Sequence, residues 1–195
     1  KGAPVDKTRY TFAMRIAVIG PQNTGKSTFV KDFLDNFTHY TTPDKSYREH
    51  VTSIGLPINQ GTNEESQEAI LNFLFDQTIK YEGKNVIFDR CVVDNYAYTH
   101  AAYLHERVSK AFVLHTKRRM YEQLAHLDAL FFIPTTAGVK LVEDTFRDVD
   151  IDFVDLINRM FMETLFDISH RSHIPIFVIT GNRQDRIEQV KRHIF

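Results

Sequence analysis

Residues 15–28 read Arg-Ile-Ala-Val-Ile-Gly-Pro-Gln-Asn-Thr-Gly-Lys-Ser-Thr and carry the strongest structural signal of the sequence. The β-branched run at residues 15–19 predicts a buried strand, and the apolar spacing of residues 27–37 predicts a helix. Between them stands the pattern Gly-x-x-x-x-Gly-Lys-Ser, which we call the phosphate loop (residues 20–27). Its glycines permit backbone angles that a side chain forbids, so the loop amides can turn inward and cradle phosphate oxygens. The stretch therefore predicts a strand, a phosphate-binding loop and a helix in direct succession.

A nucleoside triphosphate is the ligand that this arrangement favours, because the helix after the loop adds its positive N-terminal end. Lys26 can reach the β- and γ-phosphates, and the hydroxyl of Ser27 can ligate Mg²⁺. The alternative is a glycine-containing turn that matches by chance, which four restricted positions in the correct context make rare. We therefore expect ATP and Mg²⁺ as cofactors, with the nucleotide held by Gly20, Gln22, Asn23, Thr24, Gly25, Lys26, Ser27 and Thr28.

The rest of the chain alternates short apolar runs with longer helical patterns. Further strands are predicted at residues 38–42, 85–89, 129–133 and 176–179; the first is weak because Pro43 stops it. Helices are predicted at residues 63–83, 93–106, 116–126, 150–169 and 183–193. Short apolar strands separated by helices indicate an α/β fold, in which helices cover both faces of a parallel sheet. We assign residues 14–195 to a single domain and residues 1–13 to a leader or a cloning remnant.

Composition excludes several classes of function. The 195 residues carry a net charge of −1, so a polybasic coat for DNA is excluded at the level of the whole chain. The single cysteine, Cys91, excludes a disulfide framework and fits a reducing compartment. The apolar runs are shorter than the roughly 20 residues that a membrane span needs. We therefore expect a cytoplasmic protein without a membrane segment.

Asp89 and Arg90 stand at the end of the strand predicted at residues 85–89, and ligands of open parallel sheets bind at the carboxyl ends of strands. Asp89 is therefore expected beside the phosphate loop, where it could hold Mg²⁺ or activate a substrate hydroxyl. Arg90 could clamp an anionic or hydroxyl-bearing substrate. An aspartate that merely caps the next helix is the alternative, but the adjacent arginine favours the functional interpretation. Ser27 and Asp89 are the expected metal ligands.

A second carboxylate, Asp44, follows the weak strand and should lie at the same edge of the sheet. There it could accept a proton from the hydroxyl that attacks the γ-phosphate. Glu49 is a rival for this role, and Asp89 is a third candidate. An ordinary Pro-Asp turn is the competing interpretation of residues 43–44. The identity of the base stays open at this point.

The segment at residues 135–148 is polar, contains Gly138 and joins Pro134 to a long predicted helix. Such a segment can close over bound phosphates as a lid and exclude water. Arg147, in preference to Lys140, would then neutralise the charge that develops during phosphoryl transfer. The alternative is a solvated connector.

Together these features resemble the P-loop kinases of nucleosides and nucleotides, and among them the nicotinamide-riboside kinase domain of bacterial NAD regulators. The resemblance covers residues 14–194 and rests on the phosphate loop, Asp44 with Arg48 and Glu49, Phe88-Asp89-Arg90 with Asp94, Ala97 and Tyr98, and residues 128–132, 143–147 and 181–186. It implies a P-loop three-layer sandwich whose sheet has five parallel strands in the order 2-3-1-4-5. It also implies catalytic roles for Lys26, Asp44, Asp89, Arg90 and Arg147, and a nucleotide contact for Arg183. Asp44 departs from this family, which more often has Glu there.

The predicted function is transfer of the γ-phosphoryl group of ATP to a hydroxyl of a nucleoside- or nucleotide-like small molecule. One alternative is a kinase for a modified base in DNA, of the hydroxymethyl-uracil type, which the net charge makes less favoured. Another is a non-catalytic nucleotide-binding regulator. A GTPase is disfavoured because the chain contains no Asn-Lys-x-Asp sequence, and a ring ATPase because Arg rather than Glu follows Asp89. The acceptor and the oligomeric state stay open.

Overall fold

The computed structural model describes residues 13–135 and 151–194. The predicted lid lies outside the described residues from residue 136 onward, and Lys140 and Arg147 lie outside them with it. Residues 1–12 of the N-terminal segment lie outside them as well. The lid and the role of Arg147 therefore stay predictions.

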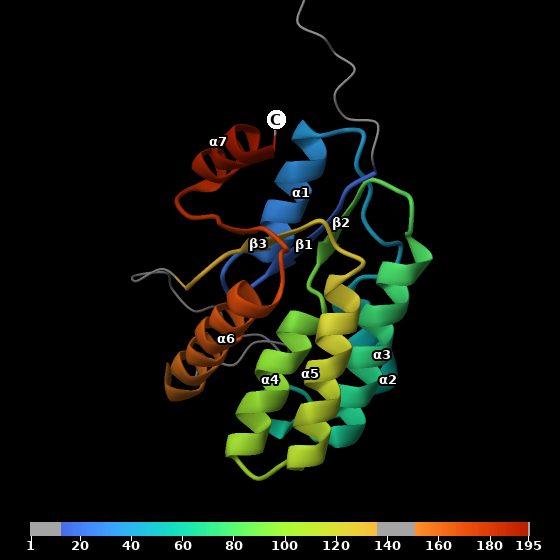
Figure 1. Cartoon of the computed structure of the whole chain (residues 1–195), viewed down its shortest axis with the longest axis vertical. Helices are drawn as coiled ribbons and strands as arrows, with labels where there is room; N and C mark the ends of the chain where they lie inside the picture. The colour runs from blue at the N-terminus through green and yellow to red at the C-terminus, as the bar shows by residue number, and fades with distance from the viewer. Residues whose placement is uncertain (1–12, 136–150, 195) are drawn as a thin grey trace, which may run out of the picture.

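A parallel sheet of four strands lies at the centre of the described residues (Figure 1). The strands are β1 (Arg15–Ile19), β2 (Val86–Asp89), β3 (Ala129–Phe132) and β4 (Ile176–Val178), in the order β2-β1-β3-β4. In the register of the sheet, Val18 pairs with Asp89 on one side and with Phe131 on the other. The carboxyl ends of β1 and β2 therefore meet at one edge, which brings the phosphate loop and Asp89 together.

The expectation of a fifth strand was wrong for the described residues, because the segment predicted at residues 38–42 makes one parallel bridge only, from Thr41 to Val86. Pro43 follows at once and has no N–H to donate to a ladder. The buried ring of Tyr40 packs on Phe33, with the ring centroids 5.0 Å apart. The bridge lies beside β2, the place of the second strand in the predicted order 2-3-1-4-5, and the other four strands lie in that order.

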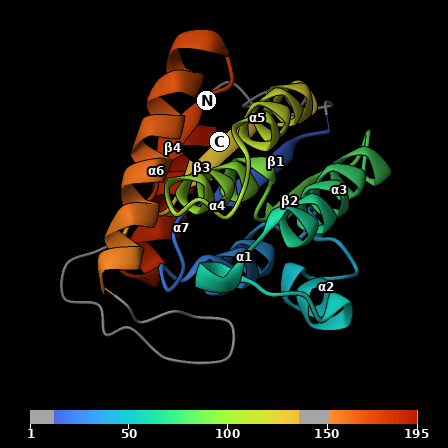
Figure 2. The ribbon, with the colours of Figure 1, turned by 90° about the horizontal axis from the view of Figure 1, so that it is seen from below.

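Helices cover both faces of the sheet (Figure 1, Figure 2). One face carries α1 (Lys26–Asn36) and α7 (Arg183–Ile194), and the other carries α3 (Glu64–Lys80), α4 (Val92–Leu104), α5 (Lys110–Leu124) and α6 (Ile151–Arg171). Successive side chains of a strand point to opposite faces. Ile16 and Val18 of β1 thus join the core under α1 and α7, while Ala17 and Ile19 join the larger core on the other face. The predicted α/β fold with helices on both faces is confirmed.

Two helical segments are not predicted by the apolar pattern: α2 (Tyr47–Ile54) and the 3-10 helix η1 (Asn59–Gly61). α2 begins with a capping box, in which Glu49 N donates to Ser46 Oγ at 3.2 Å and Ser46 N donates to Glu49 Oε2 at 2.7 Å. Val51 is its buried residue, so the helix lacks the apolar stripe on which a sequence prediction depends. None of the helices in the described ranges combines the length and apolar composition that crossing a membrane requires.

Candidate functional site

The phosphate loop begins with a close approach between two backbone segments. Gly20 has a φ of 144°, and a Cβ on it would lie 2.3 Å from the carbonyl oxygen of Ile133, directly after β3. No side chain tolerates such a contact, so glycine is required there. Gly25 (φ 83°) is the left-handed N-cap of α1, and Asn23 is also left-handed (φ 63°). These angles curl the loop around the N-terminus of α1, where unpaired N–H groups favour anions.

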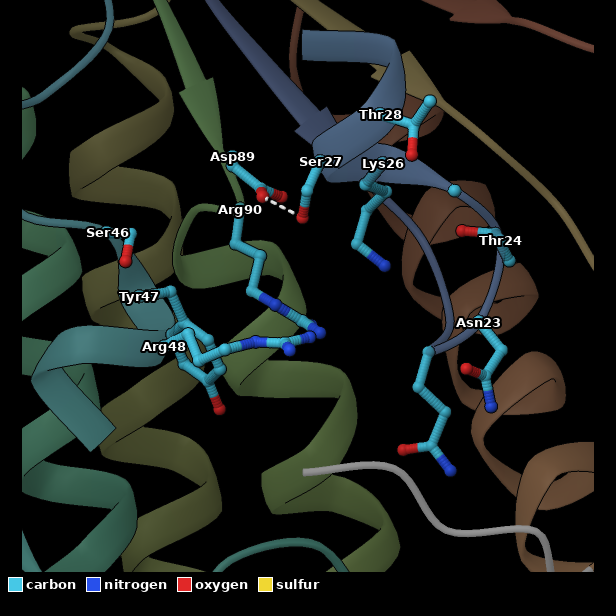
Figure 3. Close-up of a pocket in the computed structure, with 12 residues that line it drawn as sticks. Asn23, Thr24, Lys26, Ser27, Thr28, Ser46, Tyr47, Arg48, Asp89 and Arg90 are labelled. Atoms are coloured by element: carbon cyan, nitrogen blue, oxygen red, sulfur yellow. Dashed lines mark hydrogen bonds between the residues drawn. The ribbon is translucent and has the colours of Figure 1, made fainter. Parts of the chain in front are cut away.

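Lys26 lies inside this curl and is only 5% exposed. Its Nζ donates to the carbonyl oxygen of Gly20 at 2.7 Å and to that of Pro21 at 2.6 Å, and Thr24 Oγ1 donates to Pro21 O at 3.0 Å. Figure 3 shows the ammonium pointing into the space between the loop and the end of β2. A positive charge is therefore held where the sequence predicts the terminal phosphates.

Ser27 and Asp89 meet across the carboxyl edge of β1 and β2. Ser27 Oγ donates to Asp89 Oδ2 at 2.5 Å (Figure 3). The other carboxylate oxygen, Oδ1, is buried and has no hydrogen-bond partner within the described part of the chain. A buried carboxylate oxygen is costly unless a cation or a donor reaches it. Because hydroxyl and carboxylate oxygens are ligands that Mg²⁺ prefers, Ser27 Oγ and Asp89 Oδ2 fit the expected metal, which leaves Asp89 Oδ1 to accept from a donor.

Arg90 follows Asp89 in a left-handed conformation (φ 84°), which is uncommon for a residue with a side chain. Its guanidinium lies over the ring of Tyr47, 4.6 Å from the centroid, and Nη1 donates to Asp94 Oδ1 at 3.4 Å. Burial alone lowers the pKa of Arg90, but the neighbouring Tyr98, Tyr47, Asp94 and Asp89 together raise it above its ordinary value. The site therefore keeps a fixed positive charge opposite Lys26.

A cavity of about 370 Å³ opens between the phosphate loop, the start of α2 and the end of β2 (Figure 3). Most of its lining residues are the ones that the sequence predicts: Gln22, Asn23, Thr24, Gly25, Lys26, Ser27, Thr28, Asp89 and Arg90. The others are Ser46, Tyr47 and Arg48, of which the resemblance stated from the sequence includes Arg48. Their place depends on α2, which the apolar pattern does not reveal.

A narrow pocket of about 10 Å³ adjoins this cavity, and we call it the inner pocket. Tyr47 and Arg90 line both spaces, so they form the boundary between them. The other residues of the inner pocket come from η1, α3, α4 and the turn before η1: Ile58, Asn59, Gln67, Ile70, Leu74, Asp94, Asn95 and Tyr98. The inner pocket is therefore assembled from distant parts of the chain.

A polar network closes the inner pocket between α3 and α4. Asn95 Nδ2 donates to Gln67 Oε1 at 2.6 Å, Thr99 Oγ1 donates to the same oxygen at 3.2 Å, and Gln67 Nε2 donates to Thr62 Oγ1 at 2.6 Å. Asn95 Oδ1 is buried, and no described residue donates to it. Such an oxygen suits an N–H or O–H group of a ligand. Sequence reasoning missed Gln67 and Asn95, since one chain gives no sign that two polar helix residues meet.

The two rival bases lie away from both spaces. The side chain of Asp44 is 84% exposed and pairs with Lys80 at 3.3 Å; hydrogen bonds to Tyr81 and Lys80 lower its pKa. Glu49 is occupied in the cap of α2, and its hydrogen bonds with Ser46 lower its pKa. Of the three carboxylates considered as base, Asp89 is the one that lines the cavity.

Two arginines of α7 lie near α1. Arg183 makes a two-point ion pair with Asp32 of α1 and does not line the cavity. Arg186 lies against the phosphate loop instead: its Nη1 donates to Thr24 O at 3.0 Å, and its Nε donates to Gly181 O at 3.0 Å. Burial lowers the pKa of Arg186. Arg186 therefore supports the loop backbone, at a position to which the sequence assigned no role.

Comparison with known proteins gives this geometry a context. A family model described as AAA domain matches residues 15–186. A deoxyadenosine kinase from M. mycoides, with dCMP and dCDP bound, has a TM-score of 0.70 at 17% identity, over 92% of this chain and 97% of that chain. A NadR protein in complex with NR has a TM-score of 0.70 at 14% identity, over 93% of this chain and 52% of that chain. A thymidylate kinase from Candida albicans has a TM-score of 0.63 at 15% identity, over 93% and 92%.

No curated protein matches the sequence. At identities of 14–17% the solved structures show a shared fold. The resemblance to P-loop kinases of nucleosides and nucleotides, stated from the sequence, is confirmed at that level.

Proposed function

Since the chain belongs to the family described as AAA domain, we propose that it transfers the γ-phosphoryl group of ATP to a hydroxyl of a nucleoside- or nucleotide-like small molecule. The observation that carries the proposal is the meeting of a complete phosphate loop with Asp89 and Arg90 beside the inner pocket. The fold shared with a deoxyadenosine kinase and a thymidylate kinase supports it.

The donor half of the proposal rests on the phosphate loop. Its amides and the N-terminus of α1 hold phosphate oxygens, and Lys26 adds positive charge at the terminal phosphates. Ser27 and Asp89 would hold Mg²⁺, which neutralises charge on the phosphate oxygens when bound. Arg186 keeps the loop backbone in place through Thr24.

The acceptor half rests on the inner pocket. A molecule in it lies behind Tyr47 and Arg90 and presents its near end to the phosphate loop. Ile70 and Leu74 provide apolar contact for a flat ring, and Asn95 Oδ1 provides an acceptor for an N–H group on that ring. The volume of about 10 Å³ is smaller than a nucleoside, so binding requires side chains at the boundary, such as Tyr47, to move.

In the transfer step, the acceptor oxygen forms a bond to the γ-phosphorus as the bond from that phosphorus to the β–γ bridging oxygen breaks, which releases ADP. The proton of the attacking hydroxyl passes to a carboxylate. We assign this role to Oδ1 of Asp89, because Oδ2 faces Ser27 while Asp44 and Glu49 lie away from the cavity. Arg90 and Lys26 stabilise the charge that spreads over the phosphate oxygens.

The test is acceptor-dependent release of ADP from MgATP, measured against a panel of nucleosides, nucleotides and oligonucleotides. Lys26→Ala should lower turnover about 10³-fold or more, since positioning of the phosphates supplies most of the catalysis. Lys31→Ala, an exposed lysine on the same helix outside the cavity, is the matched control and should keep wild-type turnover. Absence of acceptor-dependent release in the wild-type protein, or full activity of Lys26→Ala, would contradict the proposal.

The same panel separates the alternatives. Turnover confined to an oligonucleotide that carries hydroxymethyl-uracil would favour the DNA-base kinase. Tight binding of MgATP without any acceptor-dependent turnover would favour a nucleotide-binding regulator. Asp89 and Arg90 both line the cavity. A ring ATPase stays disfavoured, because Arg rather than Glu follows Asp89.

A further inference from the structure

Asp94, in the first turn of α4, touches both halves of the proposed site. It is 2% exposed. Its Oδ1 accepts from the backbone N–H of Gly20, at the start of the phosphate loop, at 3.3 Å, and from Arg90 Nη1 at 3.4 Å. Its Oδ2 accepts from the backbone N–H of Cys91 at 3.2 Å. The carboxylate of Asp94 thus contacts the phosphate loop, Arg90 and the start of α4.

A second contact of the same kind lies one turn further along α4. The hydroxyl of Tyr98 donates to Gln22 Oε1 of the phosphate loop at 3.2 Å. Asp94 and Tyr98 are four residues apart and therefore share one helix face, and both line the inner pocket. The wall of the inner pocket is thus attached to the phosphate loop at Gly20 and at Gln22.

A carboxylate is not required at position 94 for capping alone, because a neutral side chain can also cap the start of a helix. A buried carboxylate is costly, and burial raises the pKa of Asp94 to about 6, even though Arg90 and Lys26 favour its charged form. Asp89, Tyr47 and Tyr98 complete the group of titratable side chains around Arg90. A neutral cap would satisfy Cys91 alone, whereas the charge of Asp94 also orients Arg90.

We infer that Asp94 is a positioning residue that fixes the phosphate loop and Arg90 relative to each other, so that donor and acceptor keep one spacing. The inference rests on the proposed phosphotransferase function. Asp94 acts on the acceptor through Arg90 and on the donor through Gly20. Its removal should therefore weaken binding on both sides of the site.

The variant Asp94→Asn tests this role with little change of volume. An amide has one acceptor oxygen in place of two and no charge, so the contacts to Gly20, Cys91 and Arg90 cannot all persist. We expect the Kd for MgATP, measured by calorimetry, to rise about tenfold, and the Kd for the best acceptor of the panel to rise by a similar factor. Thr116→Val is the matched control: it removes a buried hydroxyl that donates to Phe112 O at 3.0 Å on α5, outside the site, and should leave both Kd values unchanged.

A double-mutant cycle with Arg90→Gln separates two effects of Asp94, which are the arm through Arg90 to the acceptor and the arm through Gly20 to MgATP. In that background Asp94→Asn should raise the acceptor Kd less than about twofold, because the arginine through which it acts is gone, yet still weaken MgATP about tenfold through Gly20. An unchanged Kd for MgATP in Asp94→Asn, with only a change in the free energy of unfolding, would reduce Asp94 to a helix cap and overturn the inference. Full additivity on the acceptor Kd would overturn the arm through Arg90.

The proposed function and this inference fail in different ways. Wild-type protein that releases no ADP with any acceptor removes the kinase proposal, and the MgATP titration of Asp94→Asn then decides the donor arm alone. Wild-type turnover combined with unchanged Kd values in Asp94→Asn keeps the kinase and removes the role of Asp94.

Discussion

The donor and acceptor sides of the site are built in different ways. The phosphate loop is one contiguous stretch whose shape comes from backbone geometry, with Gly20 against Ile133 and Gly25 as the N-cap of α1. The inner pocket gathers side chains from η1, α2, α3 and α4, which are far apart in the sequence. A site made of contiguous backbone can be recognised in a sequence, whereas one made of distant side chains is visible only after folding.

The contrast teaches where each side is sensitive. On the donor side, a substitution acts through steric clash and through the backbone angles that it forbids, so its effects on stability and on MgATP binding should be large and local. On the acceptor side, it matters through buried hydrogen bonds, which contribute less each and change specificity. Asp89, Arg90 and Asp94 lie at the join of the two sides.

The largest effect is expected for Gly20→Ala, which places a methyl group 2.3 Å from Ile133 O at a φ of 144°. We expect the free energy of unfolding to fall by about 3–5 kcal/mol, with loss of MgATP binding. Gly83→Ala is the control, since Gly83 also has a positive φ (74°) but no atom of the described residues lies within 4 Å of its added Cβ; it should cost about 1 kcal/mol. Equal losses in urea unfolding would show that the contact with Ile133 is unimportant.

Asp89→Asn should come next, with turnover lower by about 10²–10³-fold, because the amide cannot take up the acceptor proton. Steady-state ADP release measures this effect. Asp44→Asn is the discriminating variant, since Asp44 is a rival candidate for the base in the sequence while its side chain is 84% exposed beside Lys80. A larger loss in Asp44→Asn than in Asp89→Asn would show that the described geometry gives the wrong base.

The pH dependence of stability should isolate Asp94, whose pKa burial raises from 3.8 to about 6. The folded state then holds the proton more tightly than the unfolded state, so the contribution of Asp94 to stability is full below about pH 4 and lost as the pH rises to about 6. The free energy of unfolding of Asp94→Asn minus that of the wild type should therefore rise over this window, by at most about 3 kcal/mol, and stay level above it. Urea unfolding at several pH values measures the difference. A difference that falls with pH would mean that Arg90 and Lys26 outweigh burial.

The smallest effect is expected on the acceptor side. Asn95→Ala removes the buried Oδ1 and a donor to Gln67, and should raise the acceptor Kd about tenfold without changing the Kd for MgATP. Asn72→Ala, which removes an exposed amide bonded to Glu68 on α3, is the control for both titrations. Weaker MgATP binding in Asn95→Ala would mean that the two sides are not separate at this residue.

The parts of the molecule that a single sequence predicts are those in which one local signal is strong. The run at residues 15–28 predicts β1, the phosphate loop and α1 together, because strand, glycines and apolar helix spacing agree. The helix α5 begins at Lys110 rather than at the predicted residue 116, since Ser109 caps it and residues 111–114 form a continuous apolar run rather than a helically spaced one. α2 has a capping box but a single buried residue, so the apolar pattern misses it.

The acceptor side could not be predicted for a physical reason. Gln67 and Asn95 are polar residues in predicted helices, and only the packing of α3 on α4 turns them into a buried pair. Asp44 was placed at the sheet edge on the assumption of a full second strand; with a single bridge at Thr41, its side chain lies in solvent. Arg183 and Arg186 both lie in the predicted last helix, and the sequence does not show which of them reaches the phosphate loop. In the structure Arg183 pairs with Asp32, whereas Arg186 donates to Thr24 O.

Calorimetric titration of MgATP into wild-type protein, Lys26→Ala and Lys31→Ala tests whether the phosphate loop binds a nucleoside triphosphate. We expect one saturable site in the wild type and in Lys31→Ala, and loss of binding in Lys26→Ala. A wild-type protein that takes up no magnesium-bound triphosphate, or a Lys26→Ala variant that binds as tightly as the wild type, would contradict this expectation.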